Sequence, residues 1–232
     1  MKRSKVYLSR AQSRKVDEIS IAEGVSGITL MENAGRACVS QLTERDIKTA
    51  LICCGTGNNG GDGFVIARRL AINGIPTKTI LCGDPAQIQG DALTNYQIAT
   101  GLDLDIVLLD ESWSENELEH RLKQINQQPV DWIIDCLLGT GATGNPRPPM
   151  DRLIRTANRL DVKRMAVDVP SGLDCDTGEI GDPTFNADLT CTFVARKNGF
   201  KSEQAKERLG QVKVVTIGVP MKLLQRVVDG EE

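Results

Sequence analysis

Residues 49–70 read TALICC-GTGNNGGDG-FVIARRL, and this stretch decides the fold. A short β-favouring apolar run, 49–54, leads into a glycine-rich loop, 55–63, and a helical pattern follows over 62–73. Gly55, Gly57 and Gly60 satisfy G-x-G-x-x-G between strand and helix. Glycines let backbone N–H groups approach a phosphate, and a helix N-terminus favours an anion. The stretch predicts a phosphate-binding turn, with a ligand-free tight turn as the alternative.

The same alternation of apolar runs and helical stretches continues through the chain. Near-continuous apolar strands separated by helices indicate a parallel sheet covered on both faces. No composition break divides the sequence, so we expect one α/β domain over residues 1–232. The further predicted strands are 77–82, 105–109, 131–137, 163–169, 187–194 and 211–217, and the further helices are 9–23, 28–45, 91–100, 115–127 and 150–160.

Composition excludes several classes of function. The 232 residues carry 28 Lys and Arg against 31 Asp and Glu, and this net charge of −3, with eight aromatic residues, disfavours nucleic-acid binding. A single histidine, His120, excludes metal sites built from two or more imidazoles, and its highly charged surroundings predict a solvated helix face. Trp113 and Trp132 are predicted to be packing residues.

Cysteine usage and hydropathy bear on the compartment. Seven cysteines without a C-x-x-C spacing are predicted to be reduced thiols, most of them inside apolar runs. No stretch approaches the roughly 20 apolar residues of a membrane span. The basic N-terminus, 1–15, lacks an apolar signal region and runs directly into a helical pattern; a transit peptide is the alternative. We therefore expect a cytoplasmic protein without membrane or nucleic-acid partners.

Two more loops follow predicted strands, and in a parallel sheet such loops border one ligand-binding crevice. Residues 139–144 read GTGATG directly after the strand that carries Asp135, and 168–174 read DVPSGLD. Asn59, Asp135 and Ser171 offer only oxygen ligands, which suit a hard cation better than zinc. Asp62 and Asp168 are available for acid–base chemistry or sugar hydroxyls. These loops predict a nucleotide-like ligand, with a cation beside it.

Four ordered motifs resemble the NAD(P)H-hydrate epimerases, the YjeF N-terminal domain family. They are LMENAGRA at 30–37, GTGNNGGDG at 55–63, DCLLGTGATG at 135–144 and DVPSGLD at 168–174. The resemblance runs from about Ser9 to the end of the chain. Arg196 stands where the family usually has a proline before a lysine, so Lys197 is either a crevice residue or a surface lysine.

The resemblance implies a Rossmann-like three-layer α/β/α sandwich with a mainly parallel central sheet, in a homodimer. It implies an isomerase that interconverts the R and S forms of hydrated NADH or NADPH at C6 of the nicotinamide ring. It also implies a potassium ion held by Asn59, Asp135 and Ser171, and a functional link to a separate ADP- or ATP-dependent dehydratase. The substrate-binding residues it implies are Asn58, Asn59, Gly60, Gly61, Asp62, Gly139, Thr140, Gly141, Ala142, Thr143, Gly144, Asn145 and Asp168.

Our mechanistic hypothesis makes Asp168 the catalytic acid and base. Two other functions stay open. An NAD-dependent oxidoreductase fits the literal G-x-G-x-x-G, with Asp84 as its ribose-binding acid. A non-catalytic scaffold of the same fold is the other, although a scaffold has no need of the intact Asp and Asn positions. No basic residue is clearly placed for a 2′-phosphate, so the sequence does not separate NADH hydrate from NADPH hydrate.

Overall fold

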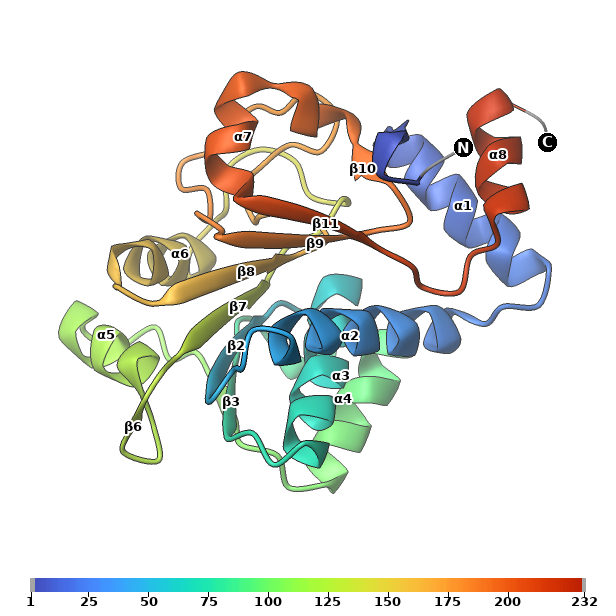
Figure 1. Cartoon of the computed structure of the whole chain (residues 1–232). Coiled ribbons are helices and arrows are strands. Elements are labelled where there is room, and N and C mark those ends of the chain that lie inside the picture. The colour runs from blue at the N-terminus through green and yellow to red at the C-terminus, as the bar shows by residue number, and fades with distance from the viewer. Residues whose placement is uncertain (1–2, 231–232) are drawn as a thin grey trace.

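The central element is a seven-stranded sheet whose neighbouring strands all run parallel (Figure 1). The structure, a computed structural model, describes residues 3–230. The strand order is β11-β9-β8-β7-β2-β3-β4. Their bounds are β2 Ala50–Cys54, β3 Thr77–Leu81, β4 Ile106–Leu108, β7 Trp132–Cys136, β8 Lys163–Val167, β9 Leu189–Phe193 and β11 Gln211–Val215. All seven predicted strands are confirmed.

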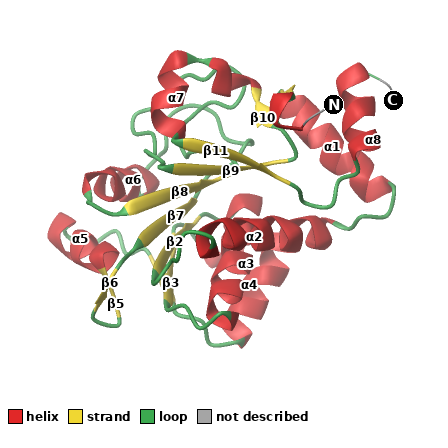
Figure 2. Ribbon diagram, in the orientation of Figure 1, coloured by secondary structure: helices red, strands yellow, loops and turns green. Residues whose placement is uncertain are grey.

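Helices cover both faces of the sheet, which confirms the predicted three-layer α/β/α class (Figure 2). On one face lie α2 (Gly27–Thr43), α3 (Asn58–Ile72) and α4 (Gly90–Gly101), and on the other α5 (Glu115–Lys123) and α6 (Met150–Arg159). Each face has its own apolar core. Beyond these layers, α1 (Arg10–Ala22) packs against α8 (Met221–Asp229), whereas α7 (Glu203–Leu209) lies apart from this pair in Figure 1.

The chain reverses its direction of travel across the sheet between β2 and β7. From β2 it proceeds outward through β3 to β4, and from β7 it proceeds the other way through β8 and β9 to β11. Every residue of β2 and β7 is buried, as expected for central strands covered on both faces. Ligands of such sheets bind outside the carboxyl ends of the strands at this switch point. The loops after β2 and β7 therefore border the expected crevice.

Two predicted helix boundaries are wrong. Helix α3 begins at Asn58 and not at residue 62, because the second half of the glycine loop forms its first turn. The helix predicted over 115–127 ends at Lys123, and a short hairpin of β5 (Gln124–Ile125) and β6 (Gln128–Pro129) follows. Left-handed backbone at Asn126 (φ 51°) and Gln127 (φ 66°) makes this turn, and a helix cannot continue through it.

Several short elements were absent from the sequence-based prediction. They include α7, α8 and a two-residue parallel pairing of β1 (Tyr7–Leu8) with β10 (Arg196–Lys197). Three 3-10 turns, Arg3–Lys5, Pro85–Gln87 and Asn198–Lys201, complete the described chain. The β1–β10 pairing matters most, because it fixes the segment that carries Lys197.

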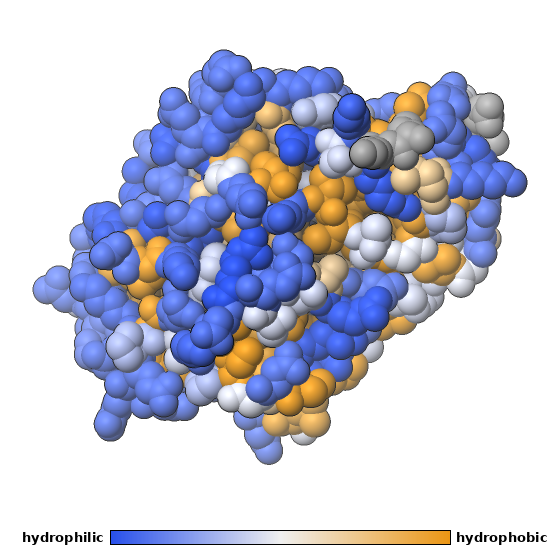
Figure 3. Space-filling view, viewed as in Figure 1, coloured by the Kyte–Doolittle hydropathy of each residue, from blue (hydrophilic) through white to orange (hydrophobic). Residues whose placement is uncertain are grey.

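The minor predictions on side chains are confirmed. All seven cysteines are buried free thiols. Trp132 is 2% exposed and Trp113 packs against the core under α5 and α6, whereas His120 is exposed on α5. Figure 3 shows a largely hydrophilic surface with scattered apolar patches. Within residues 3–230, no helix has the length and apolar character needed to cross a membrane. Residues 1–2 of the basic N-terminus lie outside the described part.

Candidate active site

The first turn of α3 lies at the switch point and presents backbone N–H groups. Gly57 is the N-cap, and its missing side chain provides no cap. Gly61 N donates to Gly57 O at 3.1 Å, which closes the first turn. The N–H groups ahead of Gly61 have no partner inside a helix, and together with the helix dipole they favour an anion. Asn58 is exposed at this turn, whereas Asn59 is 8% exposed and points inward.

The glycines of this loop serve two purposes. A Cβ at Gly60 would lie 1.9 Å from Gly55 O, and one at Gly63 would lie 2.4 Å from Cys54 Sγ. These glycines are required because α3 packs closely on the preceding loop and strand. Gly57 is different: a Cβ there would meet no atom within 4 Å. Packing therefore explains Gly60 and Gly63, whereas Gly57 leaves open space at the helix N-terminus.

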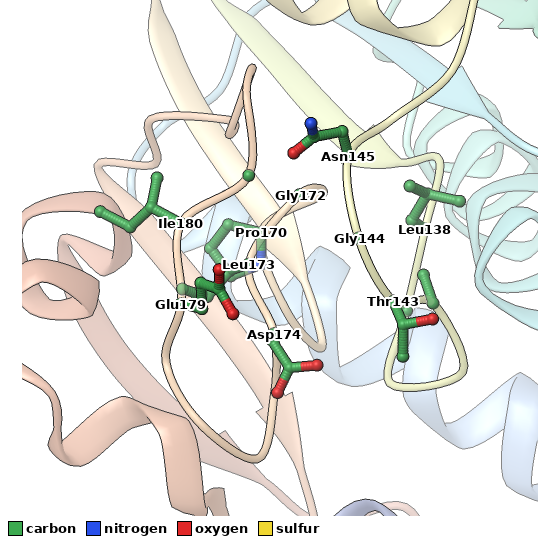
Figure 4. A pocket seen from close by; sticks show the side chains of 13 residues that line it. Leu138, Thr143, Gly144, Asn145, Pro170, Gly172, Leu173, Asp174, Glu179 and Ile180 are labelled. Atoms are coloured by element: carbon green, nitrogen blue, oxygen red, sulfur yellow. The ribbon is translucent and has the colours of Figure 1, made fainter.

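The second glycine loop borders a cavity of about 100 Å³ (Figure 4). One wall is formed by Leu138, Gly139 and residues 142–145, whereas the predicted Thr140 and Gly141 do not line the cavity; the other wall comes from Pro170, residues 172–174 and residues 179–181. Asn145 Oδ1 accepts a hydrogen bond from Asp182 N at 3.0 Å, which ties the two walls together. The predicted binding residues Thr143 and Gly144 are exposed at the rim.

Asn59, Asp135 and Ser171 come together around Leu138, although they belong to α3, to β7 and to the loop after β8. Asn59 Nδ2 donates to Leu138 O at 2.9 Å, and Leu138 N donates to Ser171 Oγ at 2.9 Å. Ser171 Oγ donates to Asp135 Oδ1 at 2.7 Å, and Ser171 N donates to Asp135 Oδ2 at 2.8 Å. This network joins the ends of β2, β7 and β8.

The donor set around Leu138 fits a hard cation. Asn59 Oδ1 is a buried acceptor without a hydrogen-bond partner, and a buried oxygen of this kind costs free energy unless a donor or cation meets it. Asp135 is fully buried, and burial raises the pKa of its carboxyl to about 6 although Ser171 and Leu137 donate to it. Amide, hydroxyl and carboxylate oxygens suit an alkali or alkaline-earth ion. The described residues hold no cluster of three His, Cys, Asp or Glu side chains that could bind a metal.

Asp168 follows β8 and is held firmly through one of its oxygens. Its backbone is left-handed (φ 64°), a conformation that aspartate adopts more readily than most residues other than glycine. Asp168 Oδ1 pairs with Lys197 Nζ at 2.7 Å, and accepts from Phe193 N at 3.1 Å and from Thr192 Oγ1 at 3.2 Å. The three contacts fix the carboxylate while Oδ2 is left for other partners.

Lys197 is a buried residue of the crevice and not a surface lysine. Its side chain is 3% exposed, and its ammonium also donates to Phe193 O at 3.1 Å and Ala195 O at 3.4 Å. The pairing of β10 with β1 fixes this segment, and from it the Lys197 side chain reaches Asp168. The sequence alone left this choice open.

Asp62 lines a second cavity, of about 150 Å³, which also lies at the carboxyl end of the sheet. Asn58 and Phe193 line it too, and Asp17 of α1 contributes from a helix that sequence reasoning did not connect with the site. Asp62 is 7% exposed, and burial, together with the charges of Asp168 and Asp17, raises the pKa of its carboxyl well above the ordinary value. The cavity thus holds an acid that resists ionisation.

Asp84, the ribose-binding residue in the oxidoreductase alternative, has a local role in the structure. It is exposed, and its Oδ1 accepts from Ala86 N at 2.9 Å and caps the short 3-10 turn. An N-cap aspartate is a sufficient structural reason for this residue.

Comparison with known proteins places this geometry in context. The sequence profile of the family described as YjeF-related protein N-terminus matches residues 27–199. A protein of Pirellula staleyi named NAD(P)H-hydrate epimerase is 40% identical over 220 residues, which cover 94% of this chain and 95% of that protein. A protein of Rhodopirellula baltica with the same name is 37% identical over 215 residues, covering 92% and 84% of the two chains.

Longer relatives and a solved structure extend the comparison. The protein of Salinibacter ruber named bifunctional NAD(P)H-hydrate repair enzyme Nnr is 33% identical over 230 residues; the match covers 96% of this chain but 42% of that protein. The crystal structure of the yeast protein YNL200c superposes with a TM-score of 0.73 at 20% identity, covering 91% of this chain and 88% of the yeast chain. The yeast protein thus has the same fold.

Proposed function

Because this chain belongs to the family of YjeF-related protein N-termini, we propose that it is an NAD(P)H-hydrate epimerase, an isomerase that interconverts the R and S forms of hydrated NADH or NADPH. Two relatives that carry this name match at 37% and 40% identity over most of both chains. The activity belongs to the repair of damaged nicotinamide nucleotides, which is also the function in the name of the bifunctional relatives.

One observation in the structure carries the proposal: a carboxylate fixed by a buried lysine follows β8, at the carboxyl end of the parallel sheet, where the glycine loops after β2 and β7 also lie. A dinucleotide needs donors for its pyrophosphate, and its damaged ring needs an acid–base group. In the proposed pose, residues 58–62 and 139–145 bind the dinucleotide, and Asp168 faces the hydrated ring. Backbone N–H groups at the start of α3 favour the pyrophosphate charge.

The reaction needs no redox partner, because only the configuration at C6 changes. The lone pair on the ring nitrogen expels the C6 hydroxyl once that oxygen has gained a proton, and a planar C=N bond forms. Water then adds to the opposite face, the C=N electrons return to nitrogen, and the added water loses a proton. The free oxygen of Asp168 is available to exchange a proton with the oxygen on the ring face that it meets, because Oδ1 is occupied by Lys197, Thr192 and Phe193.

A potassium ion is proposed at Asn59, Asp135 and Ser171. The unpartnered Asn59 Oδ1 is the observation that supports it. When bound, the ion would supply positive charge beside the two glycine loops. Asn59 ties α3 to Leu138, and Ser171 ties Leu138 to Asp135, so these residues hold the loops in the binding geometry.

Family membership is the basis of three further proposals, on oligomeric state, location and a partner enzyme. The protein acts as a homodimer, it is cytoplasmic, and it works beside a separate ADP- or ATP-dependent dehydratase. The last proposal is supported by the bifunctional relatives, of which this chain spans about two-fifths.

The activity is tested with chirally resolved R and S hydrates of NADH and of NADPH. Each pure epimer is incubated with the protein, with heat-denatured protein and with buffer, in potassium and then in sodium. Chromatography follows the approach to equilibrium. We expect the native protein to accelerate the interconversion from both directions. Equal rates in all three incubations would end the epimerase proposal.

A further inference from the structure

Inversion at C6 places a stereochemical demand on the site. The hydroxyl leaves from one face of the ring, and water adds to the opposite face. A carboxyl group that is held in one place reaches one face only. The reaction therefore needs an acid on one side of the ring and a base on the other, and the two exchange roles in the reverse direction.

Asp168 is held in one place. Two donors from β9 and one from β10 converge on Oδ1, so the carboxylate cannot turn over to serve the far face. Its backbone is also fixed, because Asp168 N donates to Cys191 O at 2.8 Å. A second proton-transferring group must come from another element.

The position of Asp62 makes it the candidate for this second proton-transferring group. It projects from α3, whereas Asp168 follows β8, and α3 covers the sheet face next to the switch point. Phe193 links the two carboxyl groups: its backbone N–H binds Asp168, and it lines the same cavity as Asp62. Asp62 therefore lines the cavity directly, and Asp168 lies behind Phe193, which forms part of the cavity wall.

The charges around Asp62 keep its proton in place. Asp17 of α1 and Asp91 of α4 line the same cavity as Asp62. The charge of Asp168 raises the pKa of Asp62, and the charge of Asp62 contributes to raising the pKa of the Cys38 thiol on α2. The nearby ammonium, Lys197, is engaged by Asp168. Within residues 3–230, no hydrogen bond or ion pair reaches the Asp62 side chain. Burial and the charges of Asp168 and Asp17 raise the pKa of Asp62 well above its ordinary value.

We propose that Asp62 and Asp168 are a catalytic pair that acts on opposite faces of the hydrated ring. Protonated Asp62 gives its proton to the C6 hydroxyl, the C6–O bond breaks, and the departing group is water. A second water forms the new C6–O bond, and its surplus proton goes to the Asp168 carboxylate. The pair then holds its proton on Asp168 and is ready for the reverse direction, or it resets by exchange with solvent. This inference rests on the proposed function.

The decisive variant is Asp62→Asn, which preserves shape and removes the proton donor. We expect a loss of about 10²–10⁴-fold in kcat, the usual contribution of general acid–base catalysis, with KM changed less than threefold. The matched control is Asp84→Asn, an exposed carboxyl that caps a 3-10 turn and that asparagine can replace. Circular dichroism and urea unfolding verify the fold of both variants.

Asp17→Asn provides a second readout that leaves the pair itself intact. Removal of the Asp17 charge lowers the pKa of Asp62, because that charge contributes to raising it. Since Asp62 must be protonated to donate, the rate falls as pH rises through its pKa. We therefore expect the falling limb of the pH profile of kcat/KM to move to lower pH in Asp17→Asn. An unmoved limb would count against the pair.

Oxygen-18 water tests the bonds that break. Each inversion by the pair incorporates one solvent oxygen at C6, which mass spectrometry detects. Inverted product without label, an Asp62→Asn variant with wild-type kcat, or a variant changed only in KM would each overturn the pair. A wild-type protein without any epimerisation would instead refute the proposed function, so the two failures are distinguishable.

Discussion

Lys197 is a buried cation whose removal tests how Asp168 is held. Lys197→Met leaves a carboxylate that is 12% exposed without its ammonium partner. Breaking one side of a buried pair costs about 3–5 kcal/mol, because the remaining charge stays desolvated. We expect urea denaturation to show a loss of this size and a smaller loss for Lys197→Arg. The double variant Asp168→Asn/Lys197→Met should regain stability relative to Lys197→Met. A loss below about 1 kcal/mol would mean that the pair does not hold Asp168.

Two glycines of the first loop can be substituted to separate a role in packing, at Gly60, from a role in ligand binding, at Gly57. Gly60→Ala forces a Cβ to within 1.9 Å of Gly55 O, so we expect a loss of about 2–4 kcal/mol or failure to fold. Gly57→Ala meets no atom within 4 Å, so its unfolding free energy should change by less than about 1 kcal/mol while KM for the hydrate rises. Equal stabilities, or an unchanged KM in Gly57→Ala, would contradict this division between the two glycines.

At the scale of elements, the sequence predicted the sheet better than the helix ends. The strands were recognisable because β2 and β7 are buried on both faces and read as continuous apolar runs. The start of α3 was misplaced because Asn58 to Gly61 have poor helix propensity, which packing against the preceding loop overrides. Helices α7 and α8 are short, of 7 and 9 residues, and give little periodic signal.

In the candidate site, too, some residues could be predicted from the sequence and others could not. Asn59, Asp135 and Ser171 could be brought together from sequence, because each follows or ends a parallel strand and such ends meet at one edge. Lys197 could not be decided, because its direction depends on the two-residue pairing of β1 with β10. Asp17 could not be found either, since nothing in its helical pattern shows which surface α1 covers.

Cation binding is a property of the joined loops and should be measurable as stability. A ligand that binds only the folded state at a hundredfold its Kd stabilises it by about 2.7 kcal/mol. We expect potassium to raise Tm by several degrees over an equal concentration of sodium. Ser171→Ala should lose this increment, since Ser171 Oγ joins Asp135 to Leu138. Exposed Ser40→Ala on α2 is the control that should keep it. Equal Tm values in both salts would contradict potassium binding.

The fold of the whole molecule places the proposed chemistry at the switch point between β2 and β7, where the chain reverses the direction in which it adds strands to the sheet. Glycine loops follow two central strands, Asp168 follows β8, and β10 supplies Lys197. No single one of these elements contains the site. The chemistry relies on carboxylates, amides and backbone groups, in agreement with a sequence that has one histidine, on an exposed helix face.

The central claim, that Asp168 carries the epimerisation, is tested most directly by the rate at which pure R hydrate equilibrates with wild-type protein and with Asp168→Asn. The substitution keeps the shape of the side chain and removes its charge. With the fold verified by urea unfolding, we predict that kcat falls by about 10²–10⁴-fold in both directions. An Asp168→Asn variant that equilibrates the hydrate at the wild-type rate would contradict the assignment.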